Sequence, residues 1–131
     1  MLTTAENQVG KYAWGTYNVL VLPPSFPYGG MENPLMTFAS PTIITKDRSE
    51  VTVALHEIMH SWTGNTVTMR NWSDFWMNEG FTVYNERKAS EVLYGKDYFM
   101  VSATAGNKSM TEDMKVFGFD SSFSSLTPDL S

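Results

Sequence analysis

The sequence predicts an α+β fold in which a small β-sheet edge is followed by helices, and two patterns support this prediction. The segment from Tyr12 to Leu22 is rich in aromatic and β-branched residues and ends in an apolar run, which predicts a buried strand. From about Arg48 to Thr63, apolar residues recur at three- and four-residue steps, the pattern of an amphipathic helix with one face in the core. Strands therefore come first along the chain and helices follow.

The first predicted strand ends at Pro23 and Pro24. Three prolines and the pair Gly29 and Gly30 then predict a loop, in which the glycines allow another part of the protein to approach the backbone closely. Residues 31–45 return to an alternating, extended pattern, which predicts an edge strand and its continuation.

Helices are predicted in the second half of the chain. The helix over residues 48–63 is expected to stop at Gly64. A second helix is predicted from near residue 72 to residue 94, because a glycine follows its last apolar position. Residues 96–117 alternate short helical patterns with a glycine, and the serine-rich tail over residues 121–131 is expected to be loosely ordered.

The bulk composition indicates a single globular domain over residues 1–131. Hydrophobic residues make up 42% of the chain and charged residues 18%, which excludes a disordered or low-complexity protein. A net charge of −5 with nine scattered basic residues argues against nucleic acid as a partner, and no apolar run is long enough to span a membrane. The chain has no cysteine, so any metal must be held by nitrogen and oxygen. The first residues lack the pattern of a signal peptide, which makes a cytoplasmic location the expectation.

Two histidines four positions apart are the strongest chemical signal in the sequence. His56 and His60 lie about one turn apart on one face of the predicted helix, close enough to bind a single ion. Glu57 is displaced around the helix, where it can act as the base that activates a metal-bound water. The alternative is that both histidines are ordinary half-buried side chains, although a chance match to this five-residue pattern is rare.

Glu79 is the candidate third ligand. A catalytic zinc ion takes three protein ligands and keeps an open fourth position, and one zinc ion is the cofactor that we expect here. Eighteen residues separate Glu79 from His60, and its carboxylate points back at the histidines if the two predicted helices pack antiparallel. Such a complex keeps a net positive charge, which lowers the pKa of bound water and polarises a scissile carbonyl.

Two further carboxylates are candidates for support of the ligands. Glu86 lies two turns after Glu79 on the same face, where it can accept a hydrogen bond from a ligand imidazole; a solvated surface position is the alternative. Asp74 is either another such partner or a charge that favours the start of the second helix, and these two explanations weigh equally. Spacing alone leaves both questions open.

Three linked motifs resemble those of the gluzincin class of zinc aminopeptidases, most closely the branch that contains leukotriene-A₄ hydrolase and aminopeptidase B. The resemblance runs from about Tyr12 to Tyr94, with a fainter trace towards the C-terminus. Its motifs are PPSFPYGGMENP at residues 23–34, HEIMHSWTGN at 56–65 and WMNEGFTVY at 76–84. The first motif alone is weak evidence, because a turn before a strand has the same pattern. Together the three motifs are highly specific.

The resemblance implies roles for the residues of the first motif. Glu32 would bind the free α-amino group of a peptide substrate, Tyr28 would help to wall the pocket, and Glu86 would support a metal ligand. The residues beside the first residues of the substrate would be Gly29, Gly30 and Met31. A carboxylate close to the metal that pairs with the α-ammonium group places the first peptide bond of the substrate at the metal, so that cleavage occurs at the N-terminus.

The resemblance also implies a fold and a size. Family members have an N-terminal β domain, a thermolysin-like catalytic domain and a C-terminal helical domain, so these residues would form only the first part of the catalytic domain. The family's oxyanion-binding tyrosine would fall shortly beyond Ser131, and losing such a donor costs about a hundred- to a thousandfold in rate. Apolar surface that the absent helices would cover is expected to promote self-association. Met59, Thr66 and Met69 replace residues that are more usual in the family and raise questions of local packing.

Three functions follow from these patterns. The first is zinc-dependent hydrolysis of the N-terminal peptide bond of peptides, with Glu57 passing a proton from water to the leaving amine. The second is a piece of a domain that binds zinc but does not catalyse. The third is hydrolysis of a lipid epoxide, an activity that one branch of the family adds and that no residue here selects.

Overall fold

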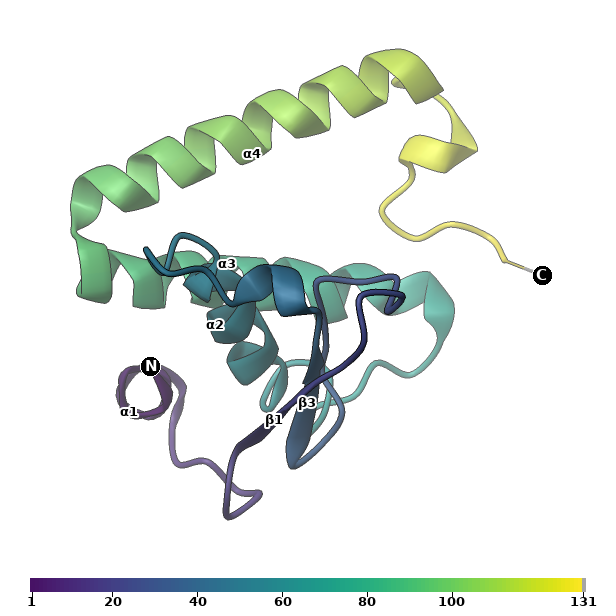
Figure 1. The fold of residues 1–131 in the computed structure, drawn as a ribbon. Helices are drawn as coiled ribbons and strands as arrows, with labels where there is room; N and C mark the ends of the chain where they lie inside the picture. The colour runs from purple at the N-terminus through teal and green to yellow at the C-terminus, as the bar shows by residue number, and fades with distance from the viewer. Residues whose placement is uncertain (131) are drawn as a thin grey trace.

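The computed structural model describes residues 1–130, and in this part of the chain a small sheet lies beside α-helices (Figure 1). The helices are α1 (Leu2–Val9), α2 (Val51–His60), α3 (Phe75–Tyr94) and α4 (Lys96–Phe117). The strands are β1 (Asn18–Val21), β2 (Gly30–Met31) and β3 (Met36–Ala39). Short 3₁₀ helices are η1 (Pro41–Ile43), η2 (Trp72–Asp74) and η3 (Ser122–Ser124). Strands followed by helices agree with the predicted α+β class.

The sheet has the strand order β1-β3-β2. β1 runs parallel to β3, with Asn18 opposite Met36, whereas β2 is antiparallel to β3, with Gly30 opposite Ala39. β2 also contacts α2, the helix that carries the two histidines. This register brings the glycine-containing loop against the histidine-bearing helix.

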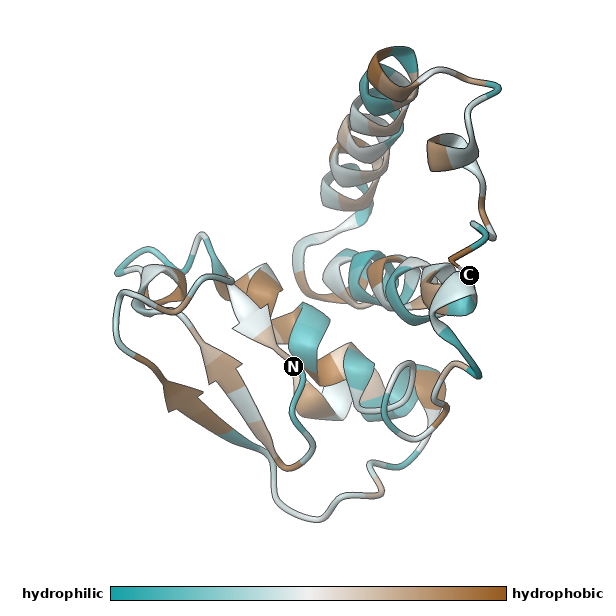
Figure 2. Ribbon diagram, turned by 90° about the vertical axis from the view of Figure 1, so that its right-hand side faces the viewer, coloured by the Kyte–Doolittle hydropathy of each residue, from teal (hydrophilic) through white to brown (hydrophobic). Residues whose placement is uncertain are grey.

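Two predictions about the strands were wrong. The strand at the end of the 12–22 segment is not buried, because Val19, Leu20 and Val21 keep 41–47% of their surface exposed at the edge of the sheet. Figure 2 shows this apolar strand and its neighbour in brown. The segment over residues 31–45 is not one edge strand, since β3 lies in the middle of the sheet and pairs on both sides. An apolar run fits a strand equally well at an edge or in the middle, so composition does not decide this.

The predictions of helices near the histidines and near Glu79 were confirmed. α2 occupies Val51–His60 within the predicted range, and Gly64 follows with a positive φ of 125° that suits only glycine. η2 and α3 together cover the second predicted helix. Helix α1 was not predicted, although its buried Ala5 and the flanking Leu2 and Val9 have helical spacing.

The core lies where α1, α2 and α3 meet. Leu55, Met59 and Ala89 are almost fully buried there, and Trp62 and Tyr17 pack against them. Met59, which raised a question of packing, is therefore a core residue that is 1% exposed. The histidine-bearing helix α2 thus packs against the buried core.

The sequence suggested short helical pieces over residues 96–117. The structure instead has the single helix α4 there, which runs back beside α3 (Figure 1). The helix continues through Gly106, where a Cβ atom would overlap the guanidinium of Arg87 of α3, and Nε of Arg87 donates to Ser102 Oγ at 3.2 Å. No residue of α4 is buried. None of the helices in residues 1–130 combines the length and hydrophobicity that a membrane crossing requires.

Candidate metal centre

The imidazole rings of the two histidines in the motif lie on one face of α2 and bring their Nε2 atoms close together. Their ring centroids are 4.6 Å apart, and the Nε2 atoms of His56 and His60 are separated by 3.0 Å. His60 is 1% exposed, whereas His56 faces the pocket and is only partly buried. The four-residue spacing therefore brings two imidazole nitrogens to a common point.

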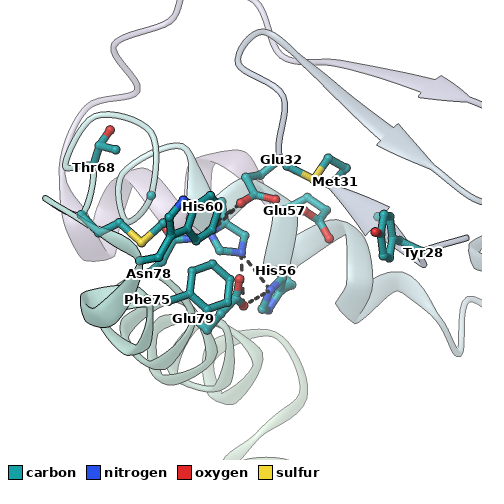
Figure 3. Close-up of a pocket in the computed structure, with 14 residues that line it drawn as sticks. Tyr28, Met31, Glu32, His56, Glu57, His60, Thr68, Phe75, Asn78 and Glu79 are labelled. Carbon is teal, nitrogen blue, oxygen red and sulfur yellow. Dashed lines mark hydrogen bonds and ion pairs between the residues drawn. The ribbon is translucent and has the colours of Figure 1, made fainter. Parts of the chain in front are cut away.

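Glu79 completes a cluster of three donor atoms. Its Oε2 lies 3.4 Å from Nε2 of His56 and 3.6 Å from Nε2 of His60, as the dashed lines in Figure 3 mark. In a tetrahedral zinc site with bonds of about 2.0–2.1 Å, donor atoms are roughly 3.3 Å apart. The observed separations of 3.0, 3.4 and 3.6 Å bracket this distance, so the donor set fits a zinc ion.

Each imidazole is oriented through its other nitrogen. Nδ1 of His56 lies 3.0 Å from Oε2 of Glu86, and Nδ1 of His60 lies 2.9 Å from the carbonyl oxygen of Thr63. Both partners are acceptors, so each Nδ1 carries a hydrogen and each Nε2 is the nitrogen that is left to bind an ion. Glu86 was a candidate from its spacing, whereas Thr63 acts through its backbone and left no signal in the sequence.

A buried threonine on α3 joins this arrangement. Thr82 is 0% exposed, and its Oγ1 lies 3.1 Å from Nδ1 of His60 and 3.0 Å from the Thr63 carbonyl. The same hydroxyl is 2.7 Å from the carbonyl oxygen of Asn78. These contacts tie the end of α2 to the first turns of α3. The sequence analysis did not single out Thr82. Its position inside a predicted helix, three residues after the candidate ligand Glu79, is the signal that could have found it.

Glu57 is positioned beside the cluster without joining it. Its side chain is 6% exposed, and no partner among the described residues satisfies its buried Oε2. Gly30 of β2 packs directly on this carboxylate, because a Cβ atom at position 30 would overlap Glu57. Burial raises the pKa of Glu57 to about 7, against the smaller opposing effects of His56 and His60. A carboxylate with such a pKa exchanges protons readily near neutral pH.

Hydrogen bonds between the acidic and imidazole groups change their proton affinities. Although burial alone lowers the pKa of His56, hydrogen bonds with Glu79 and then Glu86 raise it to about 10. Burial also opposes the shift at His60, whose pKa is raised by its hydrogen bond with Glu79. The hydrogen bonds with the two histidines in turn hold the pKa of Glu79 well below its usual range. A metal ion that binds here therefore displaces protons from the imidazoles.

The cluster lies in an open pocket of about 570 Å³ (Figure 3). Tyr28, Met31 and Glu32 line it on the side of the glycine loop, and Oε1 of Glu32 is 3.9 Å from Nδ1 of His60. On the other sides, apolar and polar side chains that sequence reasoning did not single out complete the lining, among them Thr68, Trp72, Phe75 and Asn78. The pocket thus offers two carboxylates outside the donor cluster, buried Glu57 and Glu32, and several apolar walls.

Two candidate residues do not reach the pocket. Gly29 does not line it; its carbonyl accepts a hydrogen bond from Ser40 N at 2.9 Å, and its Cα faces Val53. Asp74 occupies the N-cap of α3 and does not line the pocket either. Its position agrees with the explanation that its charge favours the start of the helix.

Comparisons with known proteins find relatives that are named as peptidases or hydrolases. The model of the peptidase family M1 domain matches residues 1–125. Leucine aminopeptidase 2 of Aspergillus niger is 53% identical over 125 residues, which are 95% of this chain and 20% of that protein. Leukotriene A-4 hydrolase of Xenopus laevis is 49% identical over 130 residues, which are 99% of this chain and 21% of that protein.

A solved structure is similar to this chain as well. Yeast LTA4 hydrolase in complex with bestatin superimposes with a TM-score of 0.94 at 43% identity, over 99% of this chain and 21% of that one. The chain thus spans about a fifth of the length of the relatives that it matches. Since the family model covers nearly all of these 131 residues, the chain belongs to the peptidase M1 domain family.

Proposed function

We propose that this chain is the metal-binding part of a zinc-dependent aminopeptidase with a thermolysin-like catalytic domain. The observation that carries the proposal is the cluster of His56, His60 and Glu79, whose donor atoms have the spacing of a zinc site, with buried Glu57 beside it. The similarity of the chain to a leucine aminopeptidase and to leukotriene A-4 hydrolase supports a hydrolytic reaction. The substrates would be peptides with a free N-terminus.

The zinc ion would be held by His56, His60 and Glu79, with Glu86 and the Thr63 carbonyl orienting the two rings. When bound, the ion supplies a Lewis acid that polarises the scissile carbonyl and makes water more acidic. Three protein ligands leave one position for water or substrate, as in catalytic zinc sites. Structural zinc sites, by contrast, use four protein ligands and no such position.

Glu57 would move the proton. Its carboxylate lies next to the donor cluster, is shielded from solvent and has a pKa raised by burial to about 7. It would accept the proton of the attacking water and return it to the nitrogen of the leaving amine as the C–N bond breaks. Gly30, which packs on Glu57, would keep this carboxylate from turning away.

Glu32 would bind the α-ammonium group of the substrate. It lines the pocket within 3.9 Å of His60 but lies outside the donor cluster, so its negative charge is available for a ligand. An ammonium held there places the first peptide bond near the metal and rejects chains that extend further towards the N-terminus. Tyr28, Gly30 and Met31 would form the wall beside the first side chain.

The proposal is tested by comparing the chain with its Glu57→Gln variant. We expect both to bind one zinc ion per chain and only the former to hydrolyse an aminoacyl arylamide. Glu112→Gln, an exposed glutamate of α4, is the matched control and should behave like the parent chain. Zinc binding with no cleavage above the Glu57→Gln level would leave a zinc-binding but non-catalytic piece. Absence of zinc uptake would end both readings.

A further inference from the structure

Two asparagines hold Glu32 at separate points. Nδ2 of Asn65 donates to the backbone carbonyl of Glu32 at 2.9 Å, and Nδ2 of Asn78 donates to its side-chain Oε1 at 3.4 Å. The first contact fixes where the main chain passes, and the second selects one orientation of the carboxylate. Figure 3 shows Asn78 and Glu32 in the same part of the pocket, next to His60.

Each asparagine is anchored to an element that supplies a metal ligand. The backbone N–H of Asn65 donates to the carbonyl oxygen of His60 at 3.0 Å, so Asn65 is tied to the end of α2. Asn78 directly precedes Glu79 in α3, is 7% exposed, and has its carbonyl bound by Thr82. Glu32 is therefore held from both of the elements that build the donor cluster.

The absence of a side chain at Gly64 leaves room for the Asn78 amide. Gly64 has a φ of 125°, and a Cβ atom there would overlap Oδ1 of Asn78 and approach Nδ1 of His60 to 3.0 Å. The amide thus occupies space that a side chain at position 64 would take. With Oδ1 packed on Gly64, the Nδ2 donor is directed towards Glu32.

The chemical type of the donor matters for the ligand that Glu32 can take. An amide is neutral, so it orients the carboxylate without cancelling its charge, whereas lysine or arginine in its place would compete with a cationic ligand. The Asn78 amide also donates to Oε1 of Glu32, the oxygen that lies 3.9 Å from Nδ1 of His60. A ligand ammonium entering through the pocket then meets a carboxylate that is fixed but still charged.

We propose that Asn78, with Asn65 as the anchor of the main chain, is a positioning residue that fixes the Glu32 carboxylate relative to the metal ligands. It thereby sets the distance between metal and bound α-ammonium, and with it the selectivity for a free N-terminus. The inference rests on the proposed function, because it takes Glu32 as the group that binds the amine.

The test measures binding and does not require turnover. Leucine hydroxamate and N-acetylleucine hydroxamate both carry a metal-binding group, but only the first has a free amine. Their dissociation constants are measured by calorimetry on the zinc-loaded chain and on its Glu32→Ala, Asn78→Ala and Asn65→Ala variants. The exposed Asn107 of α4 provides the matched control Asn107→Ala. Zinc content and far-UV circular dichroism establish that each variant is folded.

We expect the parent chain and Asn107→Ala to prefer the free amine, and Glu32→Ala to lose this preference. Asn78→Ala should reduce it by about tenfold, as for the loss of one hydrogen bond to a charged group, while binding of the N-acetyl compound stays unchanged. Asn65→Ala should reduce it less, because it leaves the carboxylate contact in place. If Asn78→Ala does not fold, Asn78→Leu, which keeps a similar shape without a donor, takes its place.

The outcomes separate the two proposals. A parent chain that binds both hydroxamates equally, like Glu32→Ala, would remove amine recognition by Glu32 and the positioning role with it. A preference that vanishes in Glu32→Ala but persists in the folded Asn78 variant would overturn the positioning role alone. An equal loss of affinity for both compounds in the folded Asn78 variant would also overturn it, because that pattern indicates damage to the metal site.

Discussion

Oε2 of Glu86 lies 3.0 Å from Nδ1 of His56, on the opposite side of the ring from the nitrogen that faces Glu79. The imidazole is therefore held between two carboxylates, one at each nitrogen. This arrangement orients the ring and makes it more basic, which favours metal binding once the proton is lost. It also explains why spacing alone could name Glu86 as a candidate, since it lies two turns after Glu79 on α3.

Replacing Glu86 should weaken metal binding without abolishing it. In Glu86→Gln the His56 ring loses its charged acceptor, and we expect zinc affinity to fall by about ten- to a hundredfold. Titration against a competing chelator measures this change. Glu112→Gln on α4 is the control for removal of an exposed negative charge. An unchanged affinity in Glu86→Gln would show that the 3.0 Å contact does not support the ligand.

Glu79 and Asp74, two acidic residues five positions apart at the start of α3, should respond differently to the loss of charge. Glu79→Ala removes one of three donors, so we expect the chain to retain much less than one zinc ion after dialysis. Asp74→Asn should keep its zinc, because Asp74 lies at the N-cap and outside the pocket. Metal analysis of both dialysed variants provides the measurement. Equal zinc loss in Asp74→Asn would restore its role as support for a ligand.

The adjacent glycines of the first motif should differ in their tolerance of a methyl group. At Gly30 a Cβ atom overlaps the buried Glu57 carboxylate, so Gly30→Ala should lower the free energy of unfolding by about 1–3 kcal/mol. At Gly29 the added atom meets Val53 Cγ1 at 3.5 Å, an ordinary contact, and the change should stay within about 0.5 kcal/mol. Urea denaturation compares the two variants. Similar urea midpoints for Gly30→Ala and Gly29→Ala would mean that the Glu57 side chain can move aside at little cost in stability.

Without metal, the folded chain should lose stability as the pH rises from about 5 to 10. The folded-state pKa of Glu57, about 7, and that of His56, about 10, both lie above their ordinary values of 4.5 and 6.5. A group with a raised pKa contributes stability that is present below its unfolded pKa and is lost as the pH rises through its folded one. The depressed pKa of Glu79 contributes stability that is lost as the pH falls below its ordinary pKa of 4.5, so it does not affect the trend above pH 5.

Urea midpoints of the metal-free chain at pH 5, 7 and 9 measure this trend. Glu57→Gln should flatten the part between pH 5 and 7, because it removes the carboxyl that titrates there. Saturating zinc should raise the midpoint most at pH 9, since the ligands bind the ion in their deprotonated forms. A metal-free midpoint that rises with pH would contradict the assigned proton affinities.

Contacts within one element were accessible from the sequence. The 56-to-60 spacing determined that two imidazoles share a face of α2, because the helical repeat leaves no other arrangement. The glycine after residue 63 marked the end of that helix for a similar local reason. The continuous helix α4 was missed because glycine is a weak helix former, and the close approach of Arg87 to Gly106 is a tertiary contact that the sequence does not show.

The sequence by itself determined the donor types, the helix that carries two of them and the candidate third ligand on the next helix. The tertiary structure decided what surrounds these groups. It placed the Thr63 carbonyl and Thr82 on His60, and the neutral amide of Asn78 on Glu32. Backbone acceptors and neutral side chains carry no distinctive spacing, and they gain a role only when packing brings distant segments within hydrogen-bond distance.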